Sequence, residues 1–520
     1  MSMKDYEMPR FPEPYWRDMD LPIYNSLIED ISVDVAIVGA GITGITAGYL
    51  LANKGLKVAI LEAGRVLNGT TGHTTAKITA QHGLIYNELL QNFGEERAKM
   101  YYQGAADAIE FINRMVNEHS IECDFSTQEA IIYAVSDQYA YQVEEEADAY
   151  RKLGIRGELT EAALPFNIKS MSTLVMPDQA QFHPLKYLNV LLRKFIEAGG
   201  VVYENVTATD VEEGSQPKVV LRNGKKVTCE HVIAASHFPF VDKNGFYFTR
   251  LEVKRSYIVA VTTQKEFPGG MYYGADSPTR SLRSTPLENG EQLVLVSGDG
   301  HKTGQGGDGH KTGQGVDTMK HYMALEEFAN DVFGIKEYKY RWSAQDMITL
   351  DKIPYIGPVT EKNSNIHIAT GYRKWGMTNG TQAALLLSDT ILGKENMYRD
   401  FYAPQRFDSD PDIKKFIKIN ADVAKHLVKG KLEYVGKEPG EVEVDEGAVV
   451  MVKGERAGAY RDHDGCLHLV DTTCTHLGCE VEWNHGDRTW DCPCHGSRYT
   501  YDGTVVEGPA VEPLKKLNLD

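Results

Sequence analysis

The chain has 520 residues, more than one ordinary domain holds, so we expect two or three units that each have a core. Its 55 Lys and Arg residues against 73 Asp and Glu residues give a formal net charge of -18, which repels phosphate backbones and anionic lipid headgroups and argues against nucleic acid as a partner. The first residues lack a signal-peptide pattern, and no stretch holds about 18 uninterrupted apolar residues, so the sequence predicts a cytoplasmic protein without a membrane span.

A lead segment, residues 1–29, precedes a βαβ pattern in residues 33–64, "VDVAIVGAGITGITAGYLLANKGLKVAILEAG". The apolar run 33–38 is typical of a buried parallel strand, and 57–61 predicts the next strand. A glycine-rich turn and a helix lie between them. This order of elements is that of a dinucleotide-binding unit.

Each glycine of the turn has a separate task. Gly39 permits the tight turn, Gly41 lets the backbone approach a pyrophosphate, and Gly44 lets helix and strand pack closely. Glu62, at the end of the second strand, is placed to accept a hydrogen bond from a ribose hydroxyl. The complete unit predicts a bound dinucleotide.

The next segment bears on whether that dinucleotide is FAD or NAD. Residues 63–83, "AGRVLNGTTGHTTAKITAQHG", supply small and hydroxyl side chains that could line a second stretch of cofactor. Outside the glycine-rich repeat at residues 298–315, the sequence contains no second G-x-G-x-x-G for a nicotinamide nucleotide. A single dinucleotide-binding site favours a flavin that the substrate reduces directly, without a nicotinamide nucleotide.

The middle of the chain continues with alternating helices and strands. Residues 183–206 predict a helix with Pro184 near its first turn, followed by a strand after Gly199 and Gly200. "KVTCEHVIAASHFPF" predicts a strand that opens into a loop at residues 235–237. These elements extend the α/β pattern.

The nonapeptide "GDGHKTGQG" occurs twice in tandem, at residues 298–306 and 307–315. It does not fit the phosphate-loop pattern G-x-x-x-x-G-K-[ST], because His precedes Lys302 and Lys311. We expect a solvent-exposed, glycine-rich loop, with a lid over the substrate entrance as the alternative.

After this repeat, "WSAQDMITLDKIPYIGPV" precedes "NIHIATGYRKWGMTNGTQAALLLSDTILG". The latter stretch predicts a strand, a glycine-rich turn and a helix. A second helix N-terminus would then lie near the flavin ring.

Residues 30–405 resemble the FAD-dependent oxidoreductases of the D-amino-acid oxidase, glycine oxidase and sarcosine oxidase superfamily. The resemblance rests on the glycine turn with Glu62 and on "QFHPLKYL", "VIAASHFP", "DKIPYIGP" and "ATGYRKWGMTNG". It implies an α/β FAD-binding Rossmann-like domain with an interleaved α+β substrate domain. It also implies oxidation of a C–N bond of an amino acid or amine by hydride transfer to FAD.

The resemblance assigns FAD contacts residue by residue. It places the backbone of Val206 against the adenine and four residues of the last stretch along the isoalloxazine. His73 falls where some relatives bond the flavin covalently, whereas others bind it non-covalently with a similar loop, so both remain open. The residues expected to bind FAD are Gly39, Gly41, Gly44, Glu62, Thr71, His73, Thr74, Val206, Gly371, Gly376, Met377 and Thr378.

Substrate binding is predicted at four basic or aromatic residues. A substrate carboxylate would suit a bidentate arginine, for which Arg283 and Arg255 are the candidates. Lys374 and Trp375 stand directly before Gly376 and are expected near the reactive face of the flavin. Most such charged residues are solvated, so a surface role is the alternative for each.

A linker helix is expected over residues 406–431, followed by a small all-β domain over 432–520 with short alternating strands. Five of the seven cysteines crowd into residues 466–494, as in metal sites, while Cys123 and Cys229 are expected to be buried packing residues.

Two loops of this domain, "CTH" at 474–476 and "CPCH" at 492–495, each offer one cysteine and one histidine as ligands. Tetrahedral zinc would accept such a set, but a zinc finger groups its cysteines and its histidines separately. A two-iron cluster with two Cys on one iron and two His on the other needs the mixed arrangement, which is that of a Rieske centre.

The boxes "CTHLGC" and "CPCHGS" resemble those of Rieske proteins of the cytochrome bc and b6f type. By that resemblance Cys474 and Cys492 bind one iron, and His476 and His495 bind the other. The resemblance further implies a disulfide between Cys479 and Cys494 and hydrogen bonds from Ser497 and Tyr499 to sulfur. Such hydrogen bonds raise the potential, so the upper part of the Rieske range, about -150 to +300 mV, is expected.

The whole chain resembles fused FAD-dependent oxidoreductase and Rieske proteins. The hypothesis is that an amine or amino acid reduces FAD and that the cluster then passes electrons singly outward, with a protein as candidate acceptor. A Rieske oxygenase is disfavoured, because no suitable pair of histidines with a carboxylate for a mononuclear iron is found. The alternatives are an oxygen-using oxidase with a structural or sensing cluster, a relay fed by a protein, and a reductase.

Overall fold

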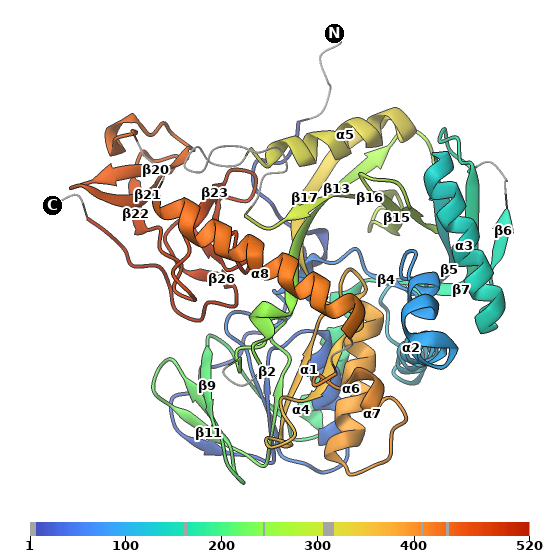
Figure 1. Cartoon of the computed structure of the whole chain (residues 1–520), viewed down its shortest axis with the longest axis horizontal. Coiled ribbons are helices and arrows are strands. Elements are labelled where there is room, and N and C mark those ends of the chain that lie inside the picture. The colour runs from blue at the N-terminus through green and yellow to red at the C-terminus, as the bar shows by residue number, and fades with distance from the viewer. Residues whose placement is uncertain are drawn as a thin grey trace.

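The computed structural model describes residues 7–160, 164–242, 245–304, 317–406, 409–432 and 436–518. Figure 1 shows the C-terminal β-strands as a separate group beside the α/β body, and α8 (Ser409–Leu432) running between the two. Among the helices of the described residues, none is both long and apolar enough to cross a bilayer.

The βαβ pattern forms the centre of a six-stranded sheet. Its strands follow the order β18-β19-β12-β2-β3-β8, and all pairs are parallel except β18 with β19. The four residues of β2 and of β3 are all buried, as expected of strands covered on both faces. The bounds are β2 Val35–Val38, β3 Val58–Leu61, β8 Val201–Tyr203, β12 His231–Ala234, β18 Tyr355–Pro358 and β19 Ile366–Thr370.

Three helices and a small sheet cover the two faces. Val35 and Ile37 pack with α1, α4 and α6, whereas Ala36 and Val38 pack toward a four-stranded sheet of order β1-β11-β10-β9. Pro184 begins α4, and the His183 ring accepts a hydrogen bond from the Lys186 N–H at 3.3 Å. The bounds are α1 Ile42–Ala52, α4 Pro184–Glu197, α6 Gly376–Ile391, β1 Ile31–Ser32, β9 Ala208–Glu212, β10 Lys218–Leu221 and β11 Lys226–Thr228.

The second part of the body is a nine-stranded sheet with the order β17-β13-β16-β15-β14-β5-β7-β4, and β6 pairs with β7. Its segments alternate along the chain with those of the six-stranded sheet, so the interleaved arrangement predicted for the α/β and α+β parts is confirmed. The strands are β4 Lys77–Ile78, β5 Ser126–Ala134, β6 Glu158–Thr160, β7 Ser172–Gln181, β13 Leu251–Thr263, β14 Met271–Gly274, β15 Arg280–Pro286, β16 Gln292–Lys302 and β17 Ile335–Thr349. The helices are α2 Tyr86–Glu118, α3 Asp137–Leu153 and α5 Met319–Phe333, whereas the short α7, Arg399–Tyr402, lies against β18 of the six-stranded sheet.

The beginning of the tandem repeat is a β-strand and not the loop that was expected there. Residues 298–302 form the end of β16, because Gly298 pairs with Tyr257 and Lys302 pairs with Lys254 of β13. A Cβ atom at Gly298 would lie 1.9 Å from the Thr279 carbonyl oxygen, so the close approach of two strands requires glycine. Residues 305–316, and with them Lys311, lie outside the described residues.

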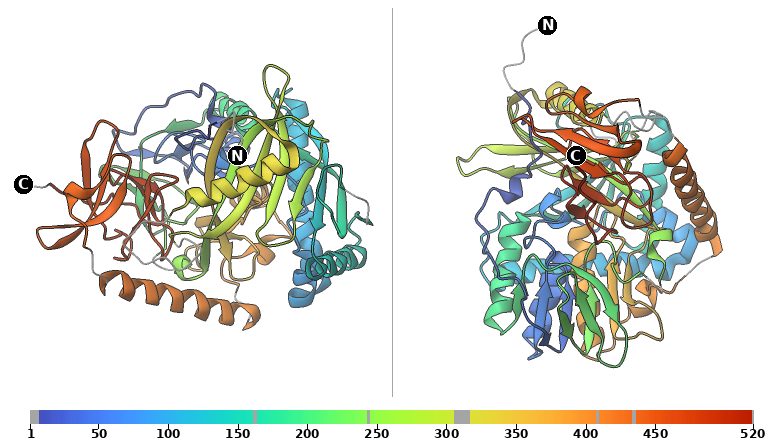
Figure 2. Two further views of the ribbon diagram at one scale, coloured as in Figure 1. Left: turned by 90° about the horizontal axis from the view of Figure 1, so that it is seen from above. Right: turned by 90° about the vertical axis from the view of Figure 1, so that its left-hand side faces the viewer.

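The C-terminal domain is all-β, as predicted. One sheet has the order β20-β21-β22 and the other β23-β24-β25-β26. Both views of Figure 2 show α8 along the outside of the molecule, and its Val423 and Leu427 pack against the core of this domain. The strands are β20 Gly447–Val452, β21 Glu455–Arg461, β22 Leu467–Asp471, β23 Glu482–Asn484, β24 Thr489–Asp491, β25 Arg498–Thr500 and β26 Val505–Glu507.

Candidate functional site

The glycine turn lies at the carboxyl edge of the six-stranded sheet, where the ends of β2 and β12 meet. Gly39 has φ of +109°, and a Cβ atom there would lie 2.5 Å from the Ala235 carbonyl oxygen. A Cβ at Gly44 would lie 1.9 Å from the Gly39 carbonyl oxygen. Larger side chains are therefore excluded, and the backbone at the start of α1 stays open to a phosphate.

Glu62 lies beside this turn at the end of β3. Its carboxylate accepts hydrogen bonds from the Ala40 N–H at 2.8 Å and the Gly64 N–H at 2.9 Å. Burial raises its pKa, and these two N–H groups oppose that effect. The Val206 N–H donates to the Glu62 carbonyl at 2.9 Å, so Val206 is held beside Glu62, and its contact with adenine remains a prediction.

The predicted flavin loop forms a short 3₁₀ helix, η2 (Thr70–His73). The Thr71 hydroxyl accepts from the Ile42 N–H at 3.1 Å, which ties this loop to the start of α1. His73 Nδ1 donates to the Gly69 carbonyl at 2.9 Å, leaving Nε2 as the nitrogen with a lone pair. The Trp16 indole donates to the Thr74 carbonyl at 2.6 Å. Covalent and non-covalent binding of the flavin at His73 stay the two alternatives.

The N-terminus of α6 is the second helix end predicted near the flavin. Gly371 has φ of +80°, and a Cβ there would lie 2.3 Å from Thr349 Cγ2, so the turn requires glycine. A Cβ at Gly376 would meet no atom within 4 Å, although the following Met377 and Thr378 are buried. Open space at the uncapped start of a buried helix fits a bound isoalloxazine.

The four predicted iron ligands come from two loops that lie together. Cys474 and Cys492 are buried, and the thiol of Cys492 lowers the pKa of Cys474 by hydrogen bonding to its sulfur. The His476 and His495 ring centroids are 5.1 Å apart. Nδ1 of His476 is buried without a hydrogen-bond partner in the described part of the chain. This set of two thiols and two imidazoles fits the Rieske cluster.

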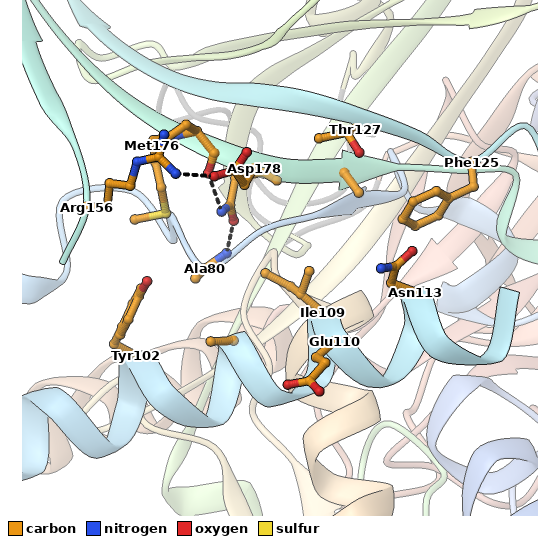
Figure 3. Close-up of a pocket in the computed structure, with 14 residues that line it drawn as sticks. Ala80, Tyr102, Ile109, Glu110, Asn113, Phe125, Thr127, Arg156, Met176 and Asp178 are labelled. Atoms are coloured by element: carbon orange, nitrogen blue, oxygen red, sulfur yellow. Dashed lines mark hydrogen bonds and ion pairs between the residues drawn. The ribbon is translucent and has the colours of Figure 1, made fainter. Parts of the chain in front are cut away.

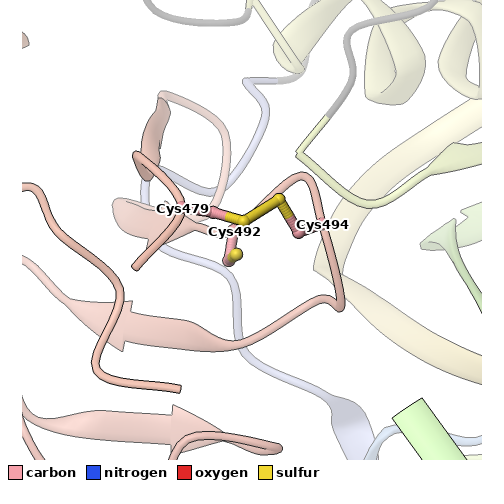
Figure 4. A group of neighbouring side chains, drawn as sticks. All are labelled: Cys479, Cys492 and Cys494. Carbon is pink, nitrogen blue, oxygen red and sulfur yellow. A yellow bond between two sulfur atoms is a disulfide. The ribbon is translucent and has the colours of Figure 1, made fainter. Parts of the chain in front are cut away.

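The two loops are also joined covalently. Cys479 and Cys494, the pair for which a disulfide was expected, are disulfide bonded, with the Cα atoms 6.6 Å apart. Figure 4 shows the Cys492 sulfur next to this bond. Because disulfide sulfurs are not thiolates, Cys492 is the member of this group that can bind iron.

The two residues predicted to donate to sulfur, Ser497 and Tyr499, both lie beside Cys474 and lower its pKa by hydrogen bonding. The Tyr499 hydroxyl lies 3.2 Å from Cys474 Sγ. The Ser497 hydroxyl accepts from the Ala510 N–H at 3.0 Å, which ties the second ligand loop to the segment after Pro509. A hydrogen bond from Ser497 to the cluster remains a prediction.

The two imidazoles face the flavin-binding part of the molecule. Phe248, in the 3₁₀ helix η3 (Tyr247–Thr249), places its ring 5.5 Å from His476 and 5.3 Å from His495 between centroids. Phe238, which follows β12, lies 6.5 Å from His476. The two imidazole rings of the C-terminal domain therefore contact the body of the same chain.

A family model, FAD dependent oxidoreductase, matches residues 34–390. The chain belongs to this family. A second model, the Rieske [2Fe-2S] domain, matches residues 428–518, so this FAD-dependent oxidoreductase carries a Rieske domain, and its cofactors are FAD and a [2Fe-2S] cluster.

Relatives agree with both parts. The "Putative Rieske 2Fe-2S iron-sulfur protein YhfW" of Bacillus subtilis is 48% identical over 510 residues, 98% of either chain. Gamma-glutamylputrescine oxidoreductase of Escherichia coli is 24% identical over 389 residues, 73% of this chain and 88% of its own. The crystal structure of glycine oxidase from Geobacillus kaustophilus shares the fold with a TM-score of 0.57 at 18% identity, over 73% of this chain and all of its own.

The predicted substrate arginines of this oxidoreductase have other partners. Arg283 is 1% exposed and donates to the carbonyls of Thr75 and Ala76 at 3.0 and 2.9 Å. Burial lowers its pKa to about 9. It therefore holds the flavin loop, and substrate binding by Arg283 remains a prediction.

The expectation for Arg255 is wrong. Its guanidinium is fully buried against the Rieske domain, with Asp487 at 3.3 Å and Glu507 at 3.2 Å. The sequence carried no sign of this, because both carboxylates lie more than 230 positions away.

Lys374 and Trp375 lie at the start of α6. The Lys374 ammonium donates to the Ser256 hydroxyl and to the Asp346 carboxylate, the latter at 3.2 Å. Trp375 stacks on His82 with 5.0 Å between ring centroids. Both residues therefore border the region where the flavin is expected.

Sequence reasoning missed two buried groups near this region. His82 Nε2 lies 2.8 Å from the Thr79 carbonyl, and burial lowers the pKa of His82 to about 3, so the ring is neutral. Lys77, on β4, donates to the Tyr272 carbonyl at 2.7 Å, and burial lowers its pKa to about 7. A lysine inside the otherwise apolar and hydroxyl-rich "TTAKITA" was the available signal for Lys77.

A cavity of about 340 Å³ opens between α2 and β7, a volume within the range of small-molecule sites. Figure 3 shows Tyr102, Glu110 and Asn113 of α2 on one side and the Arg156–Asp178 ion pair on the other. Ala80 and Gln179 also line it, and the Ala80 N–H donates to Gln179 Oε1 at 2.7 Å. The cavity thus reaches the segment that leads to His82.

Proposed function

We propose that this oxidoreductase oxidises a C–N bond of an amine or amino acid by hydride transfer to FAD and passes the electrons singly to its Rieske cluster. FAD supplies hydride acceptance, and the cluster supplies one-electron transfer. The names of two similar proteins, gamma-glutamylputrescine oxidoreductase and glycine oxidase, support a substrate of this class.

The orientation of the Rieske domain carries the proposal. Both histidines predicted to bind iron point at Phe248, so a cluster bound to them would have its histidine side toward the flavin-binding body. A cluster that served stability alone would not need this orientation. We infer that the flavin is the donor to the cluster.

Residues of the flavin-binding body beside α6 are suited to bind the substrate. Lys374 and Asp346 together offer an ammonium and a carboxylate beside α6, and they can pair with the opposite charges of an amino acid or amine. Trp375 and neutral His82 are buried and stack on each other at the start of α6. Arg283 positions the loop that contains His73 and Thr74.

We further propose a protein as the one-electron acceptor. Leu477 stands next to His476 in the ligand loop and is 46% exposed, so a partner can approach the cluster closely there. Turnover with a one-electron cytochrome should exceed turnover with oxygen, and a faster oxygen reaction that is unaffected by His495→Ala would contradict this part.

An anaerobic titration tests the main proposal. The holoprotein is titrated with a panel of amines and amino acids while flavin absorbance and the EPR signal of the reduced cluster are followed together. We expect one class of compound to bleach the flavin and the reduced Rieske signal to rise with it. A bleached flavin beside an oxidised cluster would refute the transfer, and no bleaching by any compound would refute the oxidation.

A further inference from the structure

The strand pair β13–β17 forms a wall between the Rieske domain and the residues beside α6. Arg255 pairs with Gln345 across these antiparallel strands, and Lys254 pairs with Asp346. Side chains alternate along a strand, so Arg255 and Gln345 share one face while Asp346 lies on the other. The first face reaches the Rieske domain, and the second presents Asp346 to Lys374.

Gln345 contacts the iron-binding loop directly. Its side chain is fully buried, and Nε2 donates to the Gly496 carbonyl at 3.0 Å. Gly496 follows the predicted ligand His495 and has φ of +79°. A Cβ there would lie 2.5 Å from Val253 Cγ1, so glycine allows the loop to lie flat against β13.

The orientation of the Gln345 amide follows from its partners. Oε1 accepts from Arg255 Nη2 at 3.1 Å and from the Thr303 hydroxyl at 3.0 Å. Arginine has no acceptor, so the oxygen must face it, and the amide nitrogen must then face the Gly496 carbonyl.

On its other side Gln345 joins the flavin-binding sheet. Its main-chain carbonyl lies 3.0 Å from His237 Nε2. The His237 carbonyl accepts from the Thr370 hydroxyl at 2.6 Å, and Thr370 ends β19 directly before Gly371. A continuous series of hydrogen bonds thus runs from the flavin turn to the iron-binding loop.

Further contacts tie the Rieske domain to the body. The Pro9 carbonyl accepts from Arg341 Nε of β17 at 2.6 Å. The next carbonyl, that of Arg10, accepts from Arg488 Nη1 of the Rieske domain at 2.8 Å. The N-terminal segment therefore spans both parts.

We propose that Gln345 is a positioning residue that docks the iron-binding loop at a fixed separation from the flavin, and that electrons cross between the domains along Thr370, His237, Gln345 and Gly496 without domain movement. This rests on the proposed function. Each transfer removes one electron from reduced FAD and converts one Fe(III) of the cluster to Fe(II). The external one-electron acceptor takes the first electron from the cluster before the second crosses, and the proton released by the flavin goes to solvent.

The test uses the holoprotein without any amine. A deazaflavin photoreductant reduces the flavin in a flash, and the rate at which the cluster then becomes reduced is followed at its visible absorbance. Gln345→Met keeps the side-chain length but removes the donor to Gly496, and we expect the rate to fall by about tenfold or more, because misplacing reacting groups by about 1 Å is costly. The matched control is Thr303→Val, which removes a hydrogen bond to the same amide but keeps the one to Gly496, and its rate should equal that of the wild type.

FAD content, iron content and the midpoint potentials of both groups are measured for each variant, because a merely structural defect would alter these and not the rate alone. An unchanged rate in Gln345→Met would overturn the proposal. If that variant does not fold, the wild type decides the question: transfer by a stationary domain is independent of glycerol viscosity, and a rate that falls with viscosity would establish domain movement instead. If no amine bleaches the flavin, the proposed oxidation fails while this measurement, which uses no amine, still decides the inference, so the two failures are distinguishable.

Discussion

Arg255 Nη2 lies 3.2 Å from Glu507 Oε2, in an ion pair that joins the flavin-binding body to the Rieske domain. Arg498 contacts the same carboxylate at 3.0 Å and Asp487 at 2.9 Å. Because one buried arginine of the body shares its carboxylates with one of the Rieske domain, the docking of the two parts depends on charge balance at this position.

Arg255→Met is therefore expected to destabilise the docked protein by about 3–5 kcal/mol, the usual cost of removing one partner from a buried ion pair. Urea unfolding followed by the visible circular dichroism of the cluster measures the change. Lys254→Met is the matched control, because Lys254 is partly exposed and pairs with the partly exposed Glu252. Equal stabilities of the two variants would show that Arg255 does not hold the interface.

The stability of the protein is expected to depend on pH through a carboxyl group of the same interface. Burial alone would raise the pKa of Glu507, but Arg498 and Arg255 outweigh it and lower the pKa from 4.5 to about 2. A carboxyl whose pKa is lower in the folded state stabilises the fold above pH 4.5 and loses that contribution as pH falls toward 2. The stability of the wild type should drop more steeply over this window than that of Glu507→Gln. If the stabilities of the wild type and Glu507→Gln fall in parallel with pH, Glu507 is not the group with the lowered pKa.

Gly376→Ala tests the position of the flavin. The added Cβ meets no protein atom within 4 Å, so the apoprotein should keep its stability while FAD content falls if the isoalloxazine lies there. Gly440→Ala, which also adds a methyl group in open space but far from the flavin region, serves as the control. Full FAD occupancy in both variants would remove Gly376 from the flavin site.

Cys474→Ser should remove the iron-sulfur cluster and leave FAD bound. Loss of a thiolate ligand should abolish the two irons per chain and the Rieske EPR signal, while flavin absorbance persists because the flavin turn lies in the other part of the chain. Cys466→Ser, at an exposed cysteine of the same domain, should retain both. One zinc ion in place of two irons in the purified wild type would overturn the cluster assignment.

Tyr499→Phe should lower the midpoint potential of the cluster. The lost hydroxyl is 3.2 Å from Cys474 Sγ, and a hydrogen bond to sulfur stabilises the reduced, more negative cluster. Tyr501→Phe, at a residue 38% exposed, should leave the potential unchanged. Protein-film voltammetry measures both, and an unchanged potential in Tyr499→Phe would mean that its hydroxyl bonds elsewhere.

The sequence by itself determined the parts whose residues are neighbours along the chain. The turn from Gly39 to Gly44 with Glu62, and the two boxes that contain Cys474 and Cys492, are short patterns in which local geometry requires particular residue types. The fold class and the two cofactors followed from them and are confirmed.

Tertiary structure alone decided how the two sites are joined. An arginine in a strand looks the same whether it binds a substrate or a distant carboxylate, and the register of β13 with β17 put Arg255 and Gln345 on the face toward the Rieske domain. Likewise Arg283 contacts the flavin loop because β15 lies beside it in space, about 200 positions away in the chain. Such roles depend on which side chains the packed sheets bring together, and no local pattern records that pairing.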